Sequence, residues 1–411
     1  MYAPAPLKRQ LNRSGLMLLG PAFVAAVAYV DPGNFATNIA AGATYGYLLC
    51  WVVVGANLMA VLVQYLAAKA SIATGRTLPQ LCRDHFKRST STGLWAQAEL
   101  VAIATDLAEV VGGAIALNLL FGIPLLLGGL ITGAVSFGLL IYQSRRGQRP
   151  FEAAIIGLLA VVLAGFVVST VQAQPSAAEV AGGLVPRLDG TASLVLAAGM
   201  LGATVMPHAI WLHGALVTDR HWKSLGSAEG KTRVLRATRL DVAVAMALAG
   251  AVNLAMVVVA AAALNGTGAD SLDAAHEAIG VRLGEMPALL FALALLASGF
   301  ASSSVGTYAG SVILDGFWRR HVPLAVRRLI TLLPALLILA IGLDPSRALV
   351  VSQVVLSFGI PCALWPLVRL TASRRVMGDF VNRWATTLAA CLVATAVSVL
   401  NVVLIVLTVR G

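Results

Sequence analysis

Long apolar runs, separated by short polar segments, dominate the chain. A helix of about 20 apolar residues crosses the hydrocarbon core of a bilayer, and the pattern predicts eleven such spans. The segments between them carry the Gly, Pro and charged residues expected of loops. The predicted spans cover residues 14–44, 47–74, 95–121, 124–142, 152–173, 192–217, 240–264, 287–314, 325–343, 346–369 and 384–408. We therefore expect an all-α integral membrane protein without a large soluble domain.

The composition agrees with this prediction. Apolar residues make up 59% of the 411 residues and charged residues only 11%, whereas a typical soluble domain is about 25% charged. The four cysteines show no CxxC spacing, so neither a disulfide framework nor a cysteine zinc site is expected. A removable signal peptide is not expected either, because the basic start leads into a segment long enough to remain in the membrane.

The net charge of +11 is distributed very unevenly between the two sides of the predicted membrane domain. When the segments between spans are assigned to alternating sides, 25 of the 29 basic residues fall on one side, the side that holds the N-terminus with Lys8, Arg9 and Arg13. The positive-inside rule then predicts a cytoplasmic N-terminus and an extracytoplasmic C-terminus in the plasma (inner) membrane. The membrane topology explains the excess of positive charge, so no nucleic-acid partner is needed to account for it.

The first and sixth spans are interrupted by residues that do not fit a lipid-facing helix. The first contains Asp31-Pro32-Gly33-Asn34, and the sixth contains Met206-Pro207-His208. Proline removes a backbone donor, an acid at bilayer depth is costly, and unwound backbone is tolerated there only if it is buried or lines a cavity. A single proline could be a simple kink. Two breaks favour a functional site.

The two interruptions also occupy matching places in two sets of five spans. Paired broken helices are typical of inverted-repeat transporters that bind their substrate near the bilayer midplane. We therefore predict one membrane domain over residues 1–411, with a first five-helix repeat at 14–173, a second at 192–369 and an additional helix at 384–408.

The residues at the breaks favour a divalent metal ion. Asp31 offers a carboxylate and Asn34 an amide oxygen, unwinding frees carbonyls such as those of Ala28 and Ala203, and Met206 adds a thioether. Mg²⁺ and Ca²⁺ prefer all-oxygen ligands, whereas sulfur favours softer transition metals. The set indicates Mn²⁺, Fe²⁺ or a similar transition metal ion as transported substrate, with no resident cofactor. Taken alone, Met206 is more often a packing residue.

The same residues carry a family resemblance. Asp31-Pro32-Gly33-Asn34 together with Met206-Pro207-His208 resembles the motif pair of the Nramp divalent-metal transporters. The likeness extends over nearly the whole chain and includes the segments 35–38, 75–79, 104–109, 296–299 and 302–304. It implies a LeuT-type fold and proton-coupled import of manganese and iron.

The resemblance also implies particular site residues. The family's metal ligands fall on Asp31, Asn34, Met206 and the carbonyls of Ala28 and Ala203. Gln353, in the tenth predicted span, is implied as a further ligand in some states. Ala209 departs from the family pattern, because many members have Asn there; this change should leave the ligands intact.

Three acids in the third span point to a proton route. Glu99, Asp106 and Glu109 are spaced to lie along one helical face, and acids inside a membrane favour a functional interpretation. The alternative is a set of buried ion pairs with Arg327 and Arg328, which is compatible with proton transfer. The resemblance implies proton movement through Asp31, Asp106 and Glu109, and less strongly through Glu99.

Two histidines follow the second break. His208 and His213 are five residues apart without an HExxH motif, so a zinc-protease site is not expected. Histidine titrates near physiological pH, which makes His208, beside the proposed metal, a candidate for the proton path. His213 is equally compatible with a hydrogen-bonded packing role.

The competing function classes are weaker. No GxxxxGK[ST] loop is present, which disfavours an ATP-driven pump. An amino-acid or other small-solute transporter of the same fold is the main alternative, but Asp31 would repel the carboxylate of an amino acid and Met206 would have no role. An enzyme is not expected, because neither a nucleophile–base pair nor a zinc motif is found. The expected partners are the metal ion, protons and the lipid bilayer, without an obligate protein partner.

Overall fold

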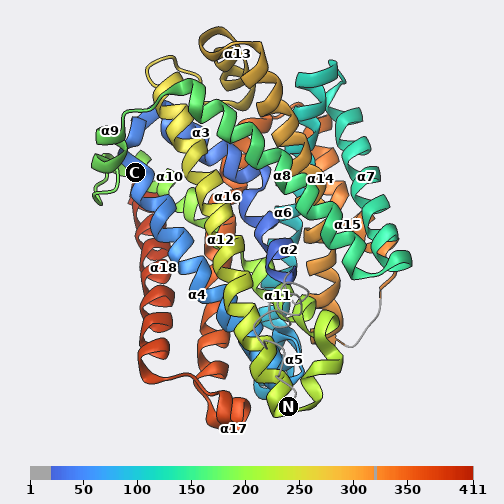
Figure 1. The fold of residues 1–411 in the computed structure, drawn as a ribbon. Helices are drawn as coiled ribbons and strands as arrows, with labels where there is room; N and C mark the ends of the chain where they lie inside the picture. Colours follow the sequence, from blue (N-terminus) through green and yellow to red (C-terminus); the bar gives the residue numbers. More distant parts are fainter. Residues whose placement is uncertain (1–19, 319–321, 411) are drawn as a thin grey trace, which may run out of the picture.

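The computed structural model describes residues 20–318 and 322–410, and within them it is helical and contains no strand. Figure 1 shows the helices as one bundle. Its helices are α2 (Pro21–Val27), η1 (Ala28–Val30), α3 (Pro32–Tyr45), η2 (Gly46–Leu49), α4 (Cys50–Thr74), α5 (Leu78–His85), α6 (Arg88–Phe121), α7 (Leu125–Arg146), α8 (Gln148–Ala173), α9 (Ala177–Gly182), α10 (Gly190–Thr204), α11 (Pro207–His221), η3 (Trp222–Gly226), α12 (Ala228–Leu264), α13 (Leu272–Leu283), α14 (Glu285–Trp318), α15 (Leu324–Ala340), α16 (Pro345–Thr371), α17 (Arg374–Met377), η4 (Gly378–Phe380) and α18 (Trp384–Arg410). The all-α prediction is confirmed.

The number of membrane spans stays a prediction. Among the described residues, nine helical stretches are long and apolar enough to cross a membrane. One of them, Pro32–Thr74, runs through two of the predicted spans, and α15 has only 17 residues. The start of the first predicted span, 14–19, lies outside the described residues.

The helix boundaries differ from the predicted ones mainly at the polar ends. α6 begins at Arg88 and α12 at Ala228, ahead of the predicted starts at 95 and 240. The short helices α9 and α13 lie in segments that were expected to be loops. The apolar pattern marks only the part of a helix that would cross the lipid, whereas the hydrogen-bonded helix continues into polar sequence.

The two predicted breaks lie in the interior of the bundle. α3 packs against α12, α10 and α16, while α10 packs against α16 and α4. α6 packs extensively against α14, and also contacts α16 and α3. A large apolar cluster of buried residues from these helices surrounds the breaks. Asp31 and Met206, which lie at the breaks, are accordingly fully buried.

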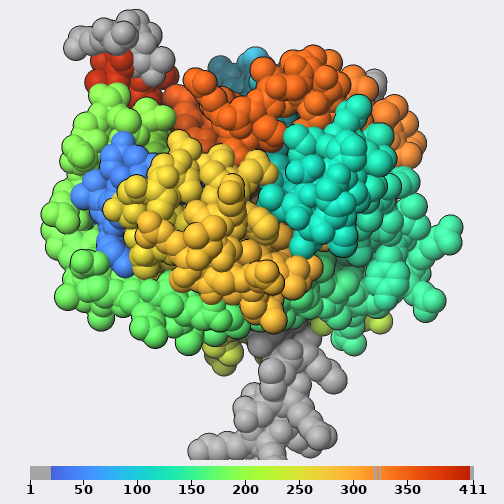
Figure 2. All heavy atoms as spheres, turned by 90° about the horizontal axis from the view of Figure 1, so that it is seen from above, coloured from blue at the N-terminus to red at the C-terminus, as the bar shows by residue number. Residues whose placement is uncertain are grey.

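Several of the basic residues that were assigned to one side lie at the same end of the bundle. In Figure 1, α5 with Arg83 and α17 with Arg374 and Arg375 lie at the lower end, whereas α9 and α13 lie at the upper end. Figure 2 views that upper face, where the gold segment around α13 occupies the middle. Of the predicted basic positions, Lys8, Arg9, Arg13, Arg319 and Arg320 lie outside the described residues.

Candidate metal centre

The first break is a change of helix at Asp31. η1 ends at Val30, Asp31 is extended (φ −81°, ψ 170°), and α3 begins at Pro32. Proline is well placed there, because the first residue of a helix needs no backbone donor. The Asp31 Oδ1 atom accepts the backbone N–H of Asn34 at 2.8 Å and so caps α3. The carboxylate is thus fixed at the start of α3.

The second break has the same form. α10 ends at Thr204, Met206 is extended (φ −61°, ψ 115°), and α11 begins at Pro207. Met206 is fully buried and belongs to the same apolar cluster as Ala28, the first residue of η1. Both interruptions that the sequence predicts are therefore present, and after each of them a new helix begins with a proline.

A hydrogen-bonded amide joins the two breaks. The Asn34 side-chain amide donates to Asp31 Oδ1 at 2.6 Å and to the backbone carbonyl of Ala203 at 3.0 Å. The hydroxyl of Thr204 donates to Asn34 Oδ1 at 3.4 Å. Three of the predicted ligand groups, the Asp31 carboxylate, the Asn34 amide and the Ala203 carbonyl, therefore meet at one point.

Gln353 reaches the same place from α16. Gly33, beside Asp31, leaves room for it, since a Cβ on Gly33 would lie only 1.9 Å from Gln353 Nε2. Gln353 is fully buried, and its Oε1 has no hydrogen-bond partner among the described residues. An oxygen without a donor is therefore available next to the first break.

The centre is closed to solvent and carries one acid at the breaks. Asp31, Asn34, Met206 and Gln353 are all fully buried. The Asp31 Oδ2 atom has no hydrogen-bond partner among the described residues. Burying an anionic oxygen without a partner is unfavourable, so a cation at this point would satisfy it. In the described part of the chain, no three His, Cys, Asp or Glu residues cluster as metal ligands.

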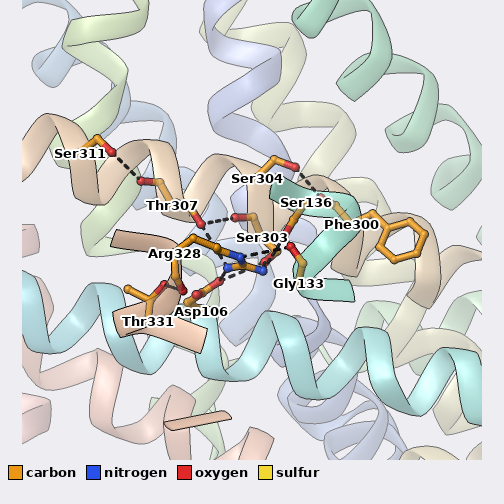
Figure 3. A network of polar contacts seen from close by, with 10 residues as sticks. All are labelled: Asp106, Gly133, Ser136, Phe300, Ser303, Ser304, Thr307, Ser311, Arg328 and Thr331. Atoms are coloured by element: carbon orange, nitrogen blue, oxygen red, sulfur yellow. Dashed lines mark hydrogen bonds and ion pairs between the residues drawn. The ribbon is translucent and has the colours of Figure 1, made fainter. Parts of the chain in front are cut away.

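The predicted ion-pair alternative for α6 is confirmed for two of the three acids, Glu99 and Asp106. Arg327 pairs with Glu99 at 2.9 Å, and the buried Arg328 pairs with the buried Asp106. Figure 3 shows Arg328 and Asp106 at the centre of a polar network that includes α7 and α14. Arg328 also donates to Ser136 at 2.5 Å, to Ser303 at 2.8 Å and to Thr307 at 3.2 Å, while Ser303 donates to Asp106 at 3.0 Å.

Glu109 differs from the other two acids because it has no ion-pair partner within residues 20–318 and 322–410. It is fully buried, and neither of its oxygens has a hydrogen-bond partner among the described residues. Asp31, Asp106 and Arg328 are the charged groups that act on it electrostatically. Gly306 makes room for it, since a Cβ there would lie 2.6 Å from Glu109 Oε2. Glu109 therefore interacts electrostatically both with Asp31 of the metal centre and with the Asp106–Arg328 pair.

His208 links the second break to α6. The ring is fully buried, its Nδ1 lies 3.3 Å from Thr105 Oγ1, and its Nε2 has no partner among the described residues. Thr105 precedes Asp106 in α6. His213, in contrast, lies 3.2 Å from the carbonyl of Gln64 through its Nδ1, which fits the packing role considered for it.

Several residues that hold the unwound backbone were not predicted. The Asn253 amide of α12 donates to the Tyr29 carbonyl at 2.6 Å, and the Ser298 hydroxyl of α14 donates to the Val30 carbonyl at 2.5 Å. At the other end of α2, Asp241 accepts the N–H groups of Gly20 and Ala22 at 3.1 and 2.9 Å. Polar residues inside apolar spans are the sequence signal that could have identified these supports.

Known proteins resemble this chain over almost its whole length. The family model described as natural resistance-associated macrophage protein-like (Nramp) matches residues 22–407. The divalent metal cation transporter MntH of Mycobacterium tuberculosis H37Rv is 55% identical over 96% of this chain and 92% of its own length. The protein of the same name from Bacillus subtilis 168 is 51% identical over 97% of this chain and 94% of its own.

Solved structures agree with the sequence comparisons. The Eremococcus coleocola manganese transporter, bound to an aromatic bis-isothiourea compound, matches with a TM-score of 0.86 at 32% identity, over 98% of this chain and 88% of that one. Mhp1, a nucleobase-cation-symport transporter, matches with a TM-score of 0.62 at 19% identity over 94% and 90%, which shows the shared fold alone. The predicted LeuT-type fold is confirmed. The chain belongs to the Nramp family.

Proposed function

We propose that this protein imports divalent transition metal ions, Mn²⁺ and Fe²⁺ among them, by proton-coupled alternating access. Relatives named divalent metal cation transporters and a manganese transporter of the same fold support metal import, and the family consists of transporters and not enzymes. We further propose that the protein lies in the plasma membrane with its N-terminus in the cytoplasm; the orientation is supported by the assignment of 25 of 29 basic residues to one side.

The main support for the metal site is that the Asn34 side chain forms hydrogen bonds with both breaks. The NH2 group of the Asn34 side chain donates hydrogen bonds both to Asp31 Oδ1 and to the Ala203 carbonyl. The two oxygens therefore already hold the partial positive charge of this NH2 group between them. A metal ion in that space would take both oxygens, and rotation of the Asn34 amide would turn its own oxygen toward the ion. The free Asp31 Oδ2 and Gln353 Oε1 would complete the oxygen ligands.

Met206 supplies the selectivity in this proposal. With the carbonyls of Ala28 and Ala203 and the oxygens of Asp31 and Asn34, its sulfur gives a mixed set of ligands. Thioether sulfur favours Mn²⁺, Fe²⁺ and their neighbours over the abundant alkaline-earth ions. One carboxylate offsets only part of the ion's charge, so the ion can be bound and then released.

Protons move, in this proposal, from Asp31 toward the cytoplasm along α6. Metal binding displaces a proton from Asp31, and Glu109 is the next buried carboxylate that interacts with it. The Asp106–Arg328 and Glu99–Arg327 pairs continue the proposed proton route along the same helix, α6. His208, with a free Nε2 beside the second break, offers a parallel acceptor.

Alternating access would be built on two related halves. We assign the first repeat to residues 14–173 and the second to 192–369, with 384–408 as an additional helix. The two breaks then occupy equivalent places, and rocking one half against the other would open the closed centre to either side in turn.

An amino-acid transporter of the same fold is the alternative. Such a protein would present helix N-termini to a substrate carboxylate. Here Asp31 already caps the N-terminus of α3 and would repel an anion. The alternative predicts uptake that does not depend on metal ions.

Uptake into proteoliposomes tests the proposal. Purified protein should admit Mn²⁺ when the outside is acidic, and a pH-sensitive dye in the lumen should report acidification during uptake. Asp31→Ala should abolish entry. Absence of Mn²⁺ entry, or entry unchanged by Asp31→Ala, would exclude the metal site; entry without acidification would exclude proton coupling.

A further inference from the structure

A groove of about 630 Å³ is lined by none of the residues of the metal centre. It is bounded by α4, α12 and the segment that joins η4 to α18. One half is apolar and includes Leu58 and Leu62 of α4 and Val242 of α12. The other half is basic and includes Lys69, Arg239 and Arg383. The groove is therefore divided into an apolar part and a cationic part.

The basic part has more positive than negative charge. Three cations line it against one carboxylate, Asp379. Lys69, Arg239 and Arg383 make no ion pair with a carboxylate of the described residues. Like charges held near one another repel unless an anion lies between them.

Two of the three cationic side chains are held in place by neutral groups. Arg239 lies over the ring of Tyr65, with 5.3 Å from the guanidinium carbon to the ring centroid, and donates from Nε to the Tyr65 hydroxyl at 3.1 Å. Lys69 is only 8% exposed and donates to Asn382 at 2.6 Å. These contacts orient the side chains without neutralising their charge, so the site is arranged for an anion.

The groove spans the boundary between hydrocarbon and headgroups. Leu58, Leu62, Tyr65 and Lys69 follow one face of α4, and the eleven helical steps from Leu58 to Lys69 extend over about 16 Å. Leu58 is 66% exposed on the apolar side, as expected of a side chain that faces lipid. Trp384, next to Arg383, is 79% exposed, and exposed Trp marks the headgroup level of membrane proteins.

We propose that this groove binds one anionic glycerophospholipid from the leaflet on the basic face of the protein. Its phosphate lies between Arg239, Arg383 and Lys69, where planar guanidinium groups suit phosphate oxygens. An acyl chain follows Leu58 and Leu62 along α4. Basic pockets between membrane helices recognise anionic headgroups in this way. The bound lipid ties α18 to α4 and α12.

The chemistry favours an anionic phospholipid over other occupants. A free phosphate ion would leave the apolar part of the groove unused. A zwitterionic lipid would bring a further positive charge, from choline or ethanolamine, into a cationic site. The proposal therefore requires both a net negative headgroup and an acyl chain.

Native mass spectrometry of the full-length protein in detergent tests this proposal. Phosphatidylglycerol should be retained in preference to phosphatidylcholine with identical acyl chains, and glycerol 3-phosphate should not compete. The Arg239→Gln/Arg383→Gln double variant should weaken phosphatidylglycerol binding roughly 30-fold, because each basic residue near an anionic lipid contributes about a factor of five. The control is Arg236→Gln/Arg375→Gln, which removes two exposed basic residues outside the groove.

A second variant keeps the charges and blocks the apolar half. Leu62→Trp should reduce retention of phosphatidylglycerol while leaving Arg239 and Arg383 in place, which separates lipid binding from headgroup attraction alone. Equal retention of both lipids by the unmodified protein would overturn the proposal. Binding that is unchanged in both the double variant and Leu62→Trp, or full competition by glycerol 3-phosphate, would overturn it as well.

Discussion

The side-chain amide of Asn34 donates a 3.0 Å hydrogen bond to the backbone carbonyl of Ala203, although the two residues are 169 positions apart. Each residue lies at the interrupted part of its own helix pair, so this bond joins the two breaks directly. The same amide also donates to Asp31 at 2.6 Å. One neutral side chain thus holds together the carboxylate and the carbonyl that we assign to the metal.

Asn34→Ala should weaken Mn²⁺ binding more than it weakens the fold. It removes one ligand oxygen and the group that positions Asp31 and Ala203. We expect the KM for Mn²⁺ uptake to rise about 10- to 100-fold, because a contact to a charged group contributes roughly 1.5–3 kcal/mol. Asn118→Ala is the control, since Asn118 donates to the Ile123 carbonyl at the end of α6. An unchanged KM for Asn34→Ala would remove Asn34 from the ligand set.

Met206→Leu should relax selectivity without disturbing the core. The substitution roughly conserves volume, so it should cost less than about 1.5 kcal/mol of stability, but it deletes the sulfur. We expect Ca²⁺ to compete better with Mn²⁺ in uptake assays. Met200→Leu is a matched control, because Met200 is also fully buried but belongs to a different apolar cluster. If both variants exclude Ca²⁺ as well as the parent does, the sulfur does not discriminate between the ions.

The sequence made some parts of this site predictable and others not. Asp31-Pro32-Gly33-Asn34 and Met206-Pro207-His208 identify the breaks because proline and glycine have backbone preferences that no neighbouring helix alters. The support from Asn253 and Ser298 depends instead on how α12 and α14 are rotated about their axes. Those helices are apolar on most faces, so periodicity does not tell which face meets the break.

The pairing on α6 illustrates the same limit. The acids Asp106 and Glu109 are close in sequence and both were candidates for pairing with Arg327 or Arg328. In the structure Arg328 pairs with Asp106, whereas Glu109 has no ion pair in the described part of the chain. That choice is decided by the packing of α15 and α14 against α6, including the space at Gly306, and these long-range contacts have no local sequence pattern.

Arg328→Ala and Asp106→Ala should each strongly destabilise the protein. Removal of one partner leaves an uncompensated buried charge, which costs about 3–5 kcal/mol. The double variant Asp106→Leu/Arg328→Met should recover part of the loss, because it leaves no buried charge. Thermal unfolding in detergent measures the effect. Arg233→Ala is the control: its pair with Glu229 is 70% and 87% exposed and should contribute about 0–1 kcal/mol. Strictly additive losses at Asp106 and Arg328 would contradict a coupled pair.

Glu109→Gln should separate proton movement from metal movement. Glutamine keeps the shape that fits against Gly306 but cannot exchange a proton, while the metal ligands at the breaks remain unchanged. We expect Mn²⁺ binding to persist and Mn²⁺ uptake to lose its dependence on external pH, with lumen acidification reduced to that of protein-free liposomes. Glu229→Gln, on the exposed start of α12, should leave acidification intact. Acidification that persists in Glu109→Gln would route the proton through His208 instead, and Thr105→Val, which removes the hydroxyl 3.3 Å from His208 Nδ1, should then alter it.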